Sequence, residues 1–203
     1  MEVIRVEEGL WHWAGPTREN ADGSTPAGSI YFEGPDALVI IDPVVPDTPH
    51  AERFWKALDA DVARMGLQPV AIVTGAAHDH GVTAFETRYG ALTQRAWQSS
   101  GDSREETSRV PQRLPEGVAL FGCGLTDERA IWIEQHRALV TGSFLQGVDG
   151  ASLVLAAHNP ATATSERCRE FLALTRLAPR HVLTCSGRPV VDVGDVALRT
   201  ALG

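Results

Sequence analysis

The residues best suited to chemistry lie in one short loop. His78, Asp79 and His80 follow Pro69–Val73, a nearly all-apolar run. Such a run is typical of a strand that is buried on both faces. Clustered imidazoles and a carboxylate are the donors that zinc takes at about 2.0–2.2 Å. The same three residues also suit a solvent-facing loop that makes only hydrogen bonds, and the spacing alone favours this simpler interpretation.

The elements that must position this loop come from short apolar patterns. Two apolar runs, Ser29–Phe32 and Ala37–Ile41, flank a Gly-Pro-Asp turn and predict a β-hairpin. Asp42-Pro43 ends the second strand, because Pro cannot donate to the ladder. Apolar residues then recur at helical spacing from His50 to Met65, and Gly66 is a helix stop.

The first half continues with a predicted helix over Val82–Tyr89, and the second half repeats the order of strands followed by helices. In the second half one helix is capped by Thr164 or Ser165, and the last one by Asp195. Further strands are predicted at Ala91–Thr93, Val118–Phe121, Ala130–Ile133, Ala138–Val140, Leu153–Leu155 and His181–Leu183. About nine or ten strands and four helices predict an α/β protein, a two-sheet sandwich with helices outside.

The composition disfavours some classes of function but does not identify one. The chain has 203 residues, which is typical of a single domain spanning residues 1–203. The net charge of −8 disfavours a nucleic-acid partner. Three cysteines without a Cys-x-x-Cys pair give neither a zinc ribbon nor a disulfide framework. With no signal-peptide pattern and no apolar stretch of about 20 residues, we expect a cytoplasmic protein without a membrane partner.

Several segments, in order and spacing, resemble the metallo-β-lactamase superfamily. They are Gly9–Trp13, Leu38–Pro43, Ala71–Gly81, Glu134–Gly142 and His181–Pro189. The resemblance covers nearly the whole chain and is nearest to a short bacterial branch. It implies a four-layer αββα sandwich, which agrees with the strand and helix order above. It also places Thr74–His80 at one edge between the two sheets, near Ser143 and Ser186.

The departures from the family signature Thr-His-x-His-x-Asp-His are decisive. Gly75 and Ala77 stand at the positions of the first two metal-binding histidines. Asp79 and His80 match the signature, whereas His78 falls on the variable position between them. Only these two expected ligands remain, and in the family both belong to the second of the two metal positions.

The later ligand positions are also altered. Gly124 aligns with the family's third metal-binding histidine, Ser143 with its bridging aspartate, and Ser186 with its last histidine. A neutral hydroxyl is a poor zinc ligand, and a catalytic zinc normally has three protein ligands. We therefore expect no cofactor; the alternative is one weakly bound zinc, for which Asp79 and His80 are the residual ligands.

Other side chains of the implied pocket are candidates for metal-free chemistry. Cys185 would need a nearby base and a lowered pKa to act as a nucleophile, and the family geometry makes His80 that base. A buried, inert thiol is the simpler interpretation of Cys185. Asp42 matches an aspartate that braces the metal loop in the family, so we expect it to hydrogen-bond that loop. The candidate catalytic residues are thus Asp79, His80 and Cys185, and the pocket residues are Thr74, His78, Asp42, Ser143 and Ser186.

Two functions remain open. The first is a protein of this fold that has lost most metal ligands and zinc-dependent hydrolysis, and that binds a small molecule, regulates, or survives as a relic. The second is a divergent hydrolase of an ester, lactone or thioester, substrates that the resemblance alone implies. It would use a single residual metal or metal-free His, Asp and Cys chemistry. The sequence does not decide whether the chain is an enzyme, and it gives no oligomeric state.

We also expect Asp79 and His80 mainly to hold their loop together. A buried Asp79 carboxylate without a metal would need hydrogen-bond donors from the loop. On this expectation, replacing Asp79 by alanine costs about 1–3 kcal/mol.

Overall fold

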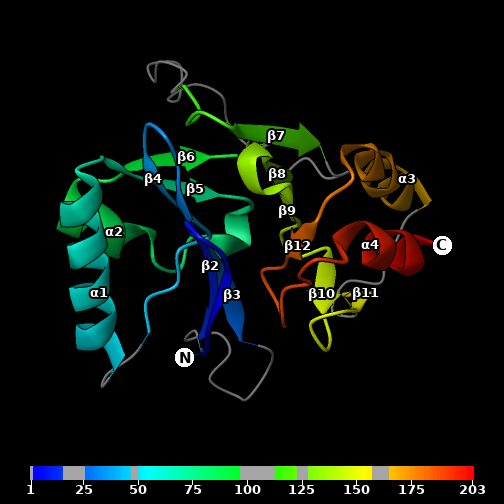
Figure 1. Cartoon of the computed structure of the whole chain (residues 1–203), viewed down its shortest axis with the longest axis horizontal. Coiled ribbons are helices and arrows are strands. Elements are labelled where there is room, and N and C mark those ends of the chain that lie inside the picture. Colours follow the sequence, from blue (N-terminus) through cyan, green and yellow to red (C-terminus); the bar gives the residue numbers. More distant parts are fainter. Residues whose placement is uncertain (1, 16–25, 47–49, 97–112, 123–127, 157–164) are drawn as a thin grey trace.

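A six-stranded sheet forms one half of the molecule in the computed structural model (Figure 1). The structure describes all residues except 1, 16–25, 47–49, 97–112, 123–127 and 157–164. The first sheet has the strand order β1-β2-β3-β4-β5-β6. Its strands are β1 Glu2–Glu7, β2 Leu10–Gly15, β3 Ala27–Glu33, β4 Leu38–Ile41, β5 Pro69–Val73 and β6 Leu92–Arg95. Strands β1 to β4 are antiparallel, and β4, β5 and β6 are parallel.

A four-stranded sheet forms the other half, with the order β12-β9-β8-β7. Its strands are β7 Val118–Gly122, β8 Arg129–Ile133, β9 Ala138–Val140 and β12 His181–Leu183. A separate antiparallel pair joins β10 Leu145–Gly147 to β11 Leu153–Leu155. The helices are α1 His50–Met65, α2 Val82–Tyr89, α3 Ser165–Leu174 and α4 Gly194–Leu202.

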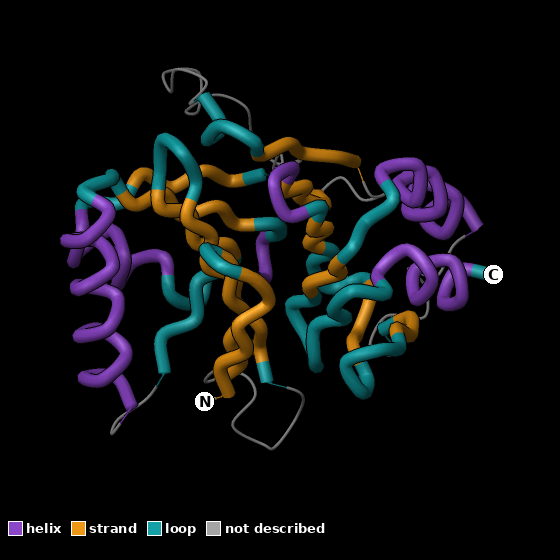
Figure 2. Tube along the Cα trace, in the orientation of Figure 1, coloured by secondary structure: helices purple, strands orange, loops and turns teal. Residues whose placement is uncertain are grey.

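Three apolar clusters show how these elements are layered. The cluster between the sheets joins residues of both, among them Phe32, Ile72 and Ile131. A second cluster packs α1 and α2 against the six-stranded sheet, and a third packs α3 and α4 against the four-stranded sheet. Figure 2 shows the same arrangement, with helices on the two outer sides and strands between them. The predicted αββα sandwich is therefore confirmed.

Most predicted elements are found, with some differences at the edges. The predicted hairpin is β3 and β4, and the predicted helix His50–Met65 is α1. Strands β1, β2 and β10 were not expected. Helix α4 begins at Gly194, so Asp195 lies in its first turn and no side-chain cap is made. In the described part of the chain, none of the helices combines the length and apolarity needed to cross a membrane.

A close backbone crossing fixes the end of β10 beside the loop that follows β12. Gly147 and Gly187 form a bridge, and a Cβ added to Gly147 would lie 1.6 Å from the carbonyl oxygen of Arg188. We expect Gly147→Ala to lower the free energy of unfolding by about 2–3 kcal/mol, because backbone must move to admit the methyl group. Gly122→Ala is the matched control, since its Cβ would meet only a Glu170 carboxylate oxygen at 3.7 Å. Equal denaturation midpoints for the two variants would contradict this view of the crossing.

Candidate functional site

A buried aspartate directly after β4 is the centre of the site. Asp42 is only 2% exposed, and its backbone is left-handed, with a φ of +48°. Aspartate tolerates this conformation better than most residues. The Asp42 N–H donates to the carbonyl of Ile72 at 2.9 Å, so the turn remains tied to β5. This geometry turns the carboxylate toward the loop that follows β5.

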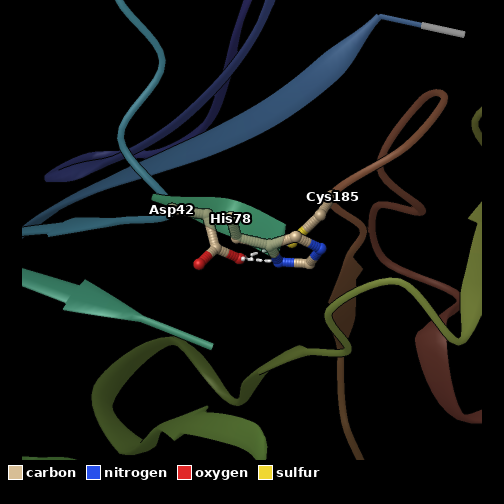
Figure 3. Close-up of side chains that lie close together, drawn as sticks. All are labelled: Asp42, His78 and Cys185. Carbon is tan, nitrogen blue, oxygen red and sulfur yellow. Dashed lines mark hydrogen bonds and ion pairs between the residues drawn. The ribbon is translucent and has the colours of Figure 1, made fainter. Parts of the chain in front are cut away.

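Thr74, the first residue of that loop, binds both oxygens of Asp42. Its backbone N–H donates to Oδ1 at 2.7 Å, and its hydroxyl donates to Oδ2 at 2.6 Å. The second donor group is His78, whose Nδ1 lies 3.0 Å from Oδ2 and 2.7 Å from the Thr74 hydroxyl. The Cys185 thiol also donates to Oδ2, at 2.7 Å (Figure 3). One carboxylate therefore joins the ends of β4, β5 and β12.

The charges in this cluster follow from burial and pairing. Burial alone would lower the pKa of His78, but the adjacent Asp42 carboxylate, with a smaller effect of Glu128, raises that pKa to about 9. Burial alone would raise the pKa of Asp42. The charge of His78 and the hydrogen bonds from His78, Cys185 and Thr74 nevertheless bring that pKa below the ordinary value. At neutral pH the two residues are therefore an imidazolium–carboxylate pair.

The Cys185 thiol behaves in the opposite way. Its pKa is well above the ordinary value because the thiol is buried and faces the Asp42 carboxylate. A nucleophilic cysteine needs a lowered pKa. The structure thus gives Cys185 a hydrogen-bonding role to Asp42 and supplies no thiolate at neutral pH.

A second buried carboxylate, Glu128, lies just before β8. It is 4% exposed, and it accepts the N–H of Ser143 at 2.5 Å and the Ser143 hydroxyl at 3.2 Å. Burial raises the pKa of Glu128, while the Ser143 N–H opposes that rise. Gly142 has to be glycine here, because its φ is +56° and a Cβ would lie 2.2 Å from Glu128 Oε1. Glu128 also bridges Gly75 through the backbone, which brings Ser143 beside the loop after β5.

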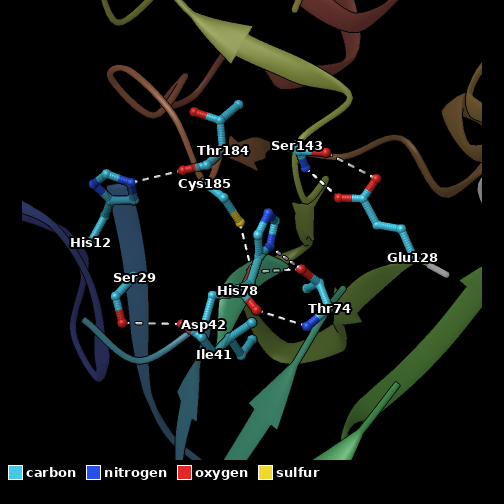
Figure 4. A network of polar contacts seen from close by, with 10 residues as sticks. All are labelled: His12, Ser29, Ile41, Asp42, Thr74, His78, Glu128, Ser143, Thr184 and Cys185. Atoms are coloured by element: carbon cyan, nitrogen blue, oxygen red, sulfur yellow. Dashed lines mark hydrogen bonds and ion pairs between the residues drawn. The ribbon is translucent and has the colours of Figure 1, made fainter. Parts of the chain in front are cut away.

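Further buried polar contacts lie beside the cluster, one of them between the two halves of the molecule and one within the six-stranded sheet (Figure 4). His12 on β2 lies 3.0 Å from the carbonyl of Thr184, through its Nε2. The Ser29 hydroxyl donates to the carbonyl of Ile41 at 3.1 Å. These bonds hold Ile41 and Thr184, the residues that directly precede Asp42 and Cys185.

The structure brings together some of the predicted site residues and separates others. Thr74, His78, Asp42 and Cys185 form one hydrogen-bonded cluster. Ser143 lies in the neighbouring pair with Glu128. Ser186 follows Cys185, and its carbonyl accepts the Gly147 N–H and the Thr184 hydroxyl. Gly124 lies outside the described residues.

The expectation that Asp79 is buried and holds the loop is wrong. Asp79 and His80 are both exposed, and hydrogen bonds among His78, Thr74 and Asp42 hold the loop. The cause is the short helical turn Ala76–His78, which turns His78 inward and leaves the next two residues outside. The Cys185 thiol, for which His80 was the expected base, donates to Asp42.

The exposure of Asp79 changes the expected effect of its substitution. We now expect Asp79→Ala to change the free energy of unfolding by less than about 0.5 kcal/mol, as is usual for surface positions. A chemical denaturation curve compared with the wild type measures this. A loss of about 1–3 kcal/mol would restore the role first expected from the sequence.

The residues at the family's metal positions do not fit a metal ion. Gly75 and Ala77 carry no side-chain donor, Asp79 and His80 are exposed, and the Ser143 hydroxyl donates to Glu128. A different group in the described residues is closer to a ligand set. One potential ligand atom each of Asp42, His78 and Cys185 lies within 4.8 Å of the others. The His78 and Cys185 atoms, however, already hydrogen-bond to the Asp42 carboxylate.

Glu128 was not among the site residues predicted from the sequence, and His78 was assigned to a variable position of the family signature. The signal that could have indicated Glu128 is an acidic residue directly before a mostly buried strand, here β8 Arg129–Ile133. Nothing in the signature Thr-His-x-His-x-Asp-His distinguishes His78. Its inward direction depends on the turn Ala76–His78, which glycine and alanine at 75–77 accommodate.

Comparison with known proteins agrees with this architecture. No protein-family model matches the sequence, and no curated protein is similar to it. Solved structures are similar over nearly the whole chain. DIM-1 metallo-β-lactamase has a TM-score of 0.65 at 14% identity, covering 99% of this chain and 96% of that one.

Two further structures were solved in mono-zinc forms. The metallo-β-lactamase FIM-1 from Pseudomonas aeruginosa has a TM-score of 0.62 at 14% identity, covering 99% of this chain and 96% of its own. An NDM_FIM-1-like metallo-β-lactamase from Erythrobacter litoralis has a TM-score of 0.61 at 16% identity, covering 99% and 94%. At these identities the likeness concerns the fold. The chain therefore has the metallo-β-lactamase fold, as its sequence motifs indicated.

Proposed function

We propose that this chain is a metal-independent protein of the metallo-β-lactamase fold, which binds a small molecule and does not perform zinc-dependent hydrolysis. The observation that carries the proposal is the occupation of the Asp42 carboxylate. Both of its oxygens accept hydrogen bonds from protein donors, and His78 supplies a buried positive charge beside it. A buried carboxylate that is paired in this way has no need of a metal ion for charge balance.

The second carboxylate supports the same proposal. Glu128 accepts two hydrogen bonds from Ser143, the residue that aligns with the family's bridging aspartate. The Ser143 hydroxyl is a neutral oxygen, which is a poor zinc ligand, and it is already hydrogen-bonded to the Glu128 carboxylate. The net charge of −8 and the lack of a basic cluster in the sequence favour a small-molecule ligand over a nucleic acid.

The test compares zinc-dependent activity with and without added metal. Chelator-treated protein is assayed with a chromogenic β-lactam and a chromogenic thioester, before and after one equivalent of zinc. We expect no zinc-stimulated rate with either substrate. A rate that appears with one equivalent of zinc and disappears with chelator would overturn the proposal.

A second candidate is a hydrolase with one weakly bound zinc. It is favoured by one observation, the approach of Asp42, His78 and Cys185 to within 4.8 Å. Binding there would break the Cys185–Asp42 and His78–Asp42 hydrogen bonds and remove the thiol proton, whose loss is disfavoured by burial. We therefore expect any such site to be weak, and a zinc titration that raises the melting temperature of the wild type but not of Cys185→Ser would support it.

A further inference from the structure

We infer that His181 is an acid sensor built into the fold, and that a proton gained by its buried ring releases the turn 191–193 that leads into α4. The inference goes beyond the binding function proposed above and does not depend on it. It concerns the opposite end of β12 from Cys185, because His181 begins that strand and Cys185 follows its end.

The hydrogen bond that His181 accepts is the first argument. The backbone N–H of Asp192 donates to Nδ1 of the ring at 3.2 Å. A backbone amide nitrogen is a donor only, so the Nδ1 that receives it carries no hydrogen, and the neutral ring has its hydrogen on Nε2. A second proton would occupy Nδ1 and set two N–H groups against each other. The bond to Asp192 therefore does not survive protonation of His181.

The surroundings of Nε2 are the second argument. His181 is 0% exposed, and its Nε2 faces Oε1 of Glu7 at 3.5 Å without making a hydrogen bond. In the part of the chain that the structure describes, this nitrogen has no other partner. Glu7 is already shared, since it accepts Nδ1–H of His136 at 2.8 Å and pairs with Arg180. A charged His181 would thus gain little from Glu7 and would lie beside the charge of Arg180.

The charged groups around the ring show which residue responds to acid. Those that face His181 are Glu7 on β1, Arg180 directly before β12, and Asp192 in the turn. Burial is the main cause that lowers the pKa of His181 below the ordinary value of 6.5. Glu7 faces His136 and Arg180 as well, and the His136 hydrogen bond is the main cause that lowers the pKa of Glu7. Glu7 therefore stays charged between about pH 5 and about pH 7.5, while His181 takes up its proton.

The turn 191–193 is the part of the backbone that this hydrogen bond holds. The residues on either side are fixed independently, because Val190 bonds β12 in both directions, at 2.8 and 2.9 Å, and the Gly194 N–H bonds the carbonyl of Arg180 at 2.9 Å. Between them Asp192 has a left-handed backbone, with a φ of +68°, which a non-glycine residue adopts only when its contacts hold it there. Loss of the His181 bond leaves Asp192 with its Arg180 ion pair and frees its N–H.

Nuclear magnetic resonance of isotope-labelled protein tests the inference, with the ring and amide signals followed from about pH 7.5 to about pH 5. We expect the neutral His181 ring to carry its hydrogen on Nε2 and to gain the second proton below pH 6.5. The Asp192 amide signal should move with the same midpoint. Its protection from hydrogen exchange, relative to the intrinsic rate at each pH, should fall by about tenfold or more at the acid end.

Two variants make the test specific to Nδ1 of His181. His181→Asn places an amide oxygen near the position of Nδ1, and this oxygen accepts a hydrogen bond but does not titrate. The variant should keep the protection of the Asp192 amide and remove its pH dependence. His136→Asn is the matched control, because it alters the other histidine at Glu7 and should leave the response of Asp192 in place. Circular dichroism verifies that each variant is folded.

Several results would overturn the inference. One is a neutral His181 ring with its hydrogen on Nδ1, and another is a ring that is still neutral at about pH 5. A ring that titrates without any change at the Asp192 amide, or an Asp192 response that persists in His181→Asn, would do so as well. The first three results need only the wild type, so the test stands even if His181→Asn cannot be purified. None of them involves zinc or a ligand, so the failure of the proposed function is a separate outcome.

Discussion

Asp42→Ala is expected to lower the free energy of unfolding by about 3–5 kcal/mol, the cost typical of removing one partner of a buried ion pair. The loss in stability is large because several hydrogen-bond donors share this one acceptor. The Thr74 N–H and hydroxyl, the His78 ring and the Cys185 thiol would all lose their acceptor together. His78 would also be left as a buried imidazolium without its counter-charge. Urea denaturation at neutral pH measures the effect.

Two further variants make this prediction specific to the buried carboxylate. Asp42→Asn keeps one acceptor oxygen but loses the charge, so its loss should be smaller than that of Asp42→Ala. Asp61→Ala removes a carboxylate that is 40% exposed and pairs with Arg64 on the surface of α1. It should cost less than about 1 kcal/mol. If Asp42→Ala were no more harmful than Asp61→Ala, Asp42 would not be the centre of the site.

The stability of the fold should decrease as the pH rises from about 6.5 toward 9, because of His78. Its pKa is raised in the folded state, so the native protein holds the proton at pH values where the unfolded chain has released it. The stabilisation by protonated His78 is therefore complete below the unfolded pKa near 6.5, and it is lost as the pH passes through the folded pKa near 9. A shift of this size corresponds to about 3 kcal/mol.

The measurement is the difference between wild type and His78→Gln in free energy of unfolding, at several values from about pH 6 to about pH 9. The difference is needed because Cys185, Tyr31 and Tyr89 also have raised pKa values and lower the stability at alkaline pH in both proteins. We expect the advantage of the wild type to shrink across this range. An advantage that is constant with pH would show that His78 is neutral in the folded state.

Much of the fold was accessible from local sequence patterns. The all-apolar run Pro69–Val73 and the helical period from His50 to Met65 each specify an element directly, since burial on both faces or on one stripe dictates the pattern. Strands β1 and β2 were not predicted. Strand β1 combines charged residues with one buried valine, Val6, so its pairing with β2 depends on a neighbour in the sheet rather than on its own pattern.

The site was less predictable, because it depends on contacts between distant segments. Asp42 was expected to brace the loop after β5, and the structure places it there. Cys185 joins the same carboxylate across 143 positions of sequence, which no local pattern encodes. The inward turn of His78 and the outward turn of Asp79 depend on one short helical turn, where successive side chains point about 120° apart around the axis. Motif alignment assigns positions but not these directions.

The central claim is that protein donors, and no metal ion, neutralise the buried Asp42 carboxylate. Elemental analysis of protein purified without added metal tests it most directly. We predict well under one equivalent of zinc, iron and manganese, together with a melting temperature that chelator leaves unchanged, since a ligand absent from the native state cannot stabilise it. A full equivalent of tightly held metal, lost in Cys185→Ser or His78→Gln, would contradict the account.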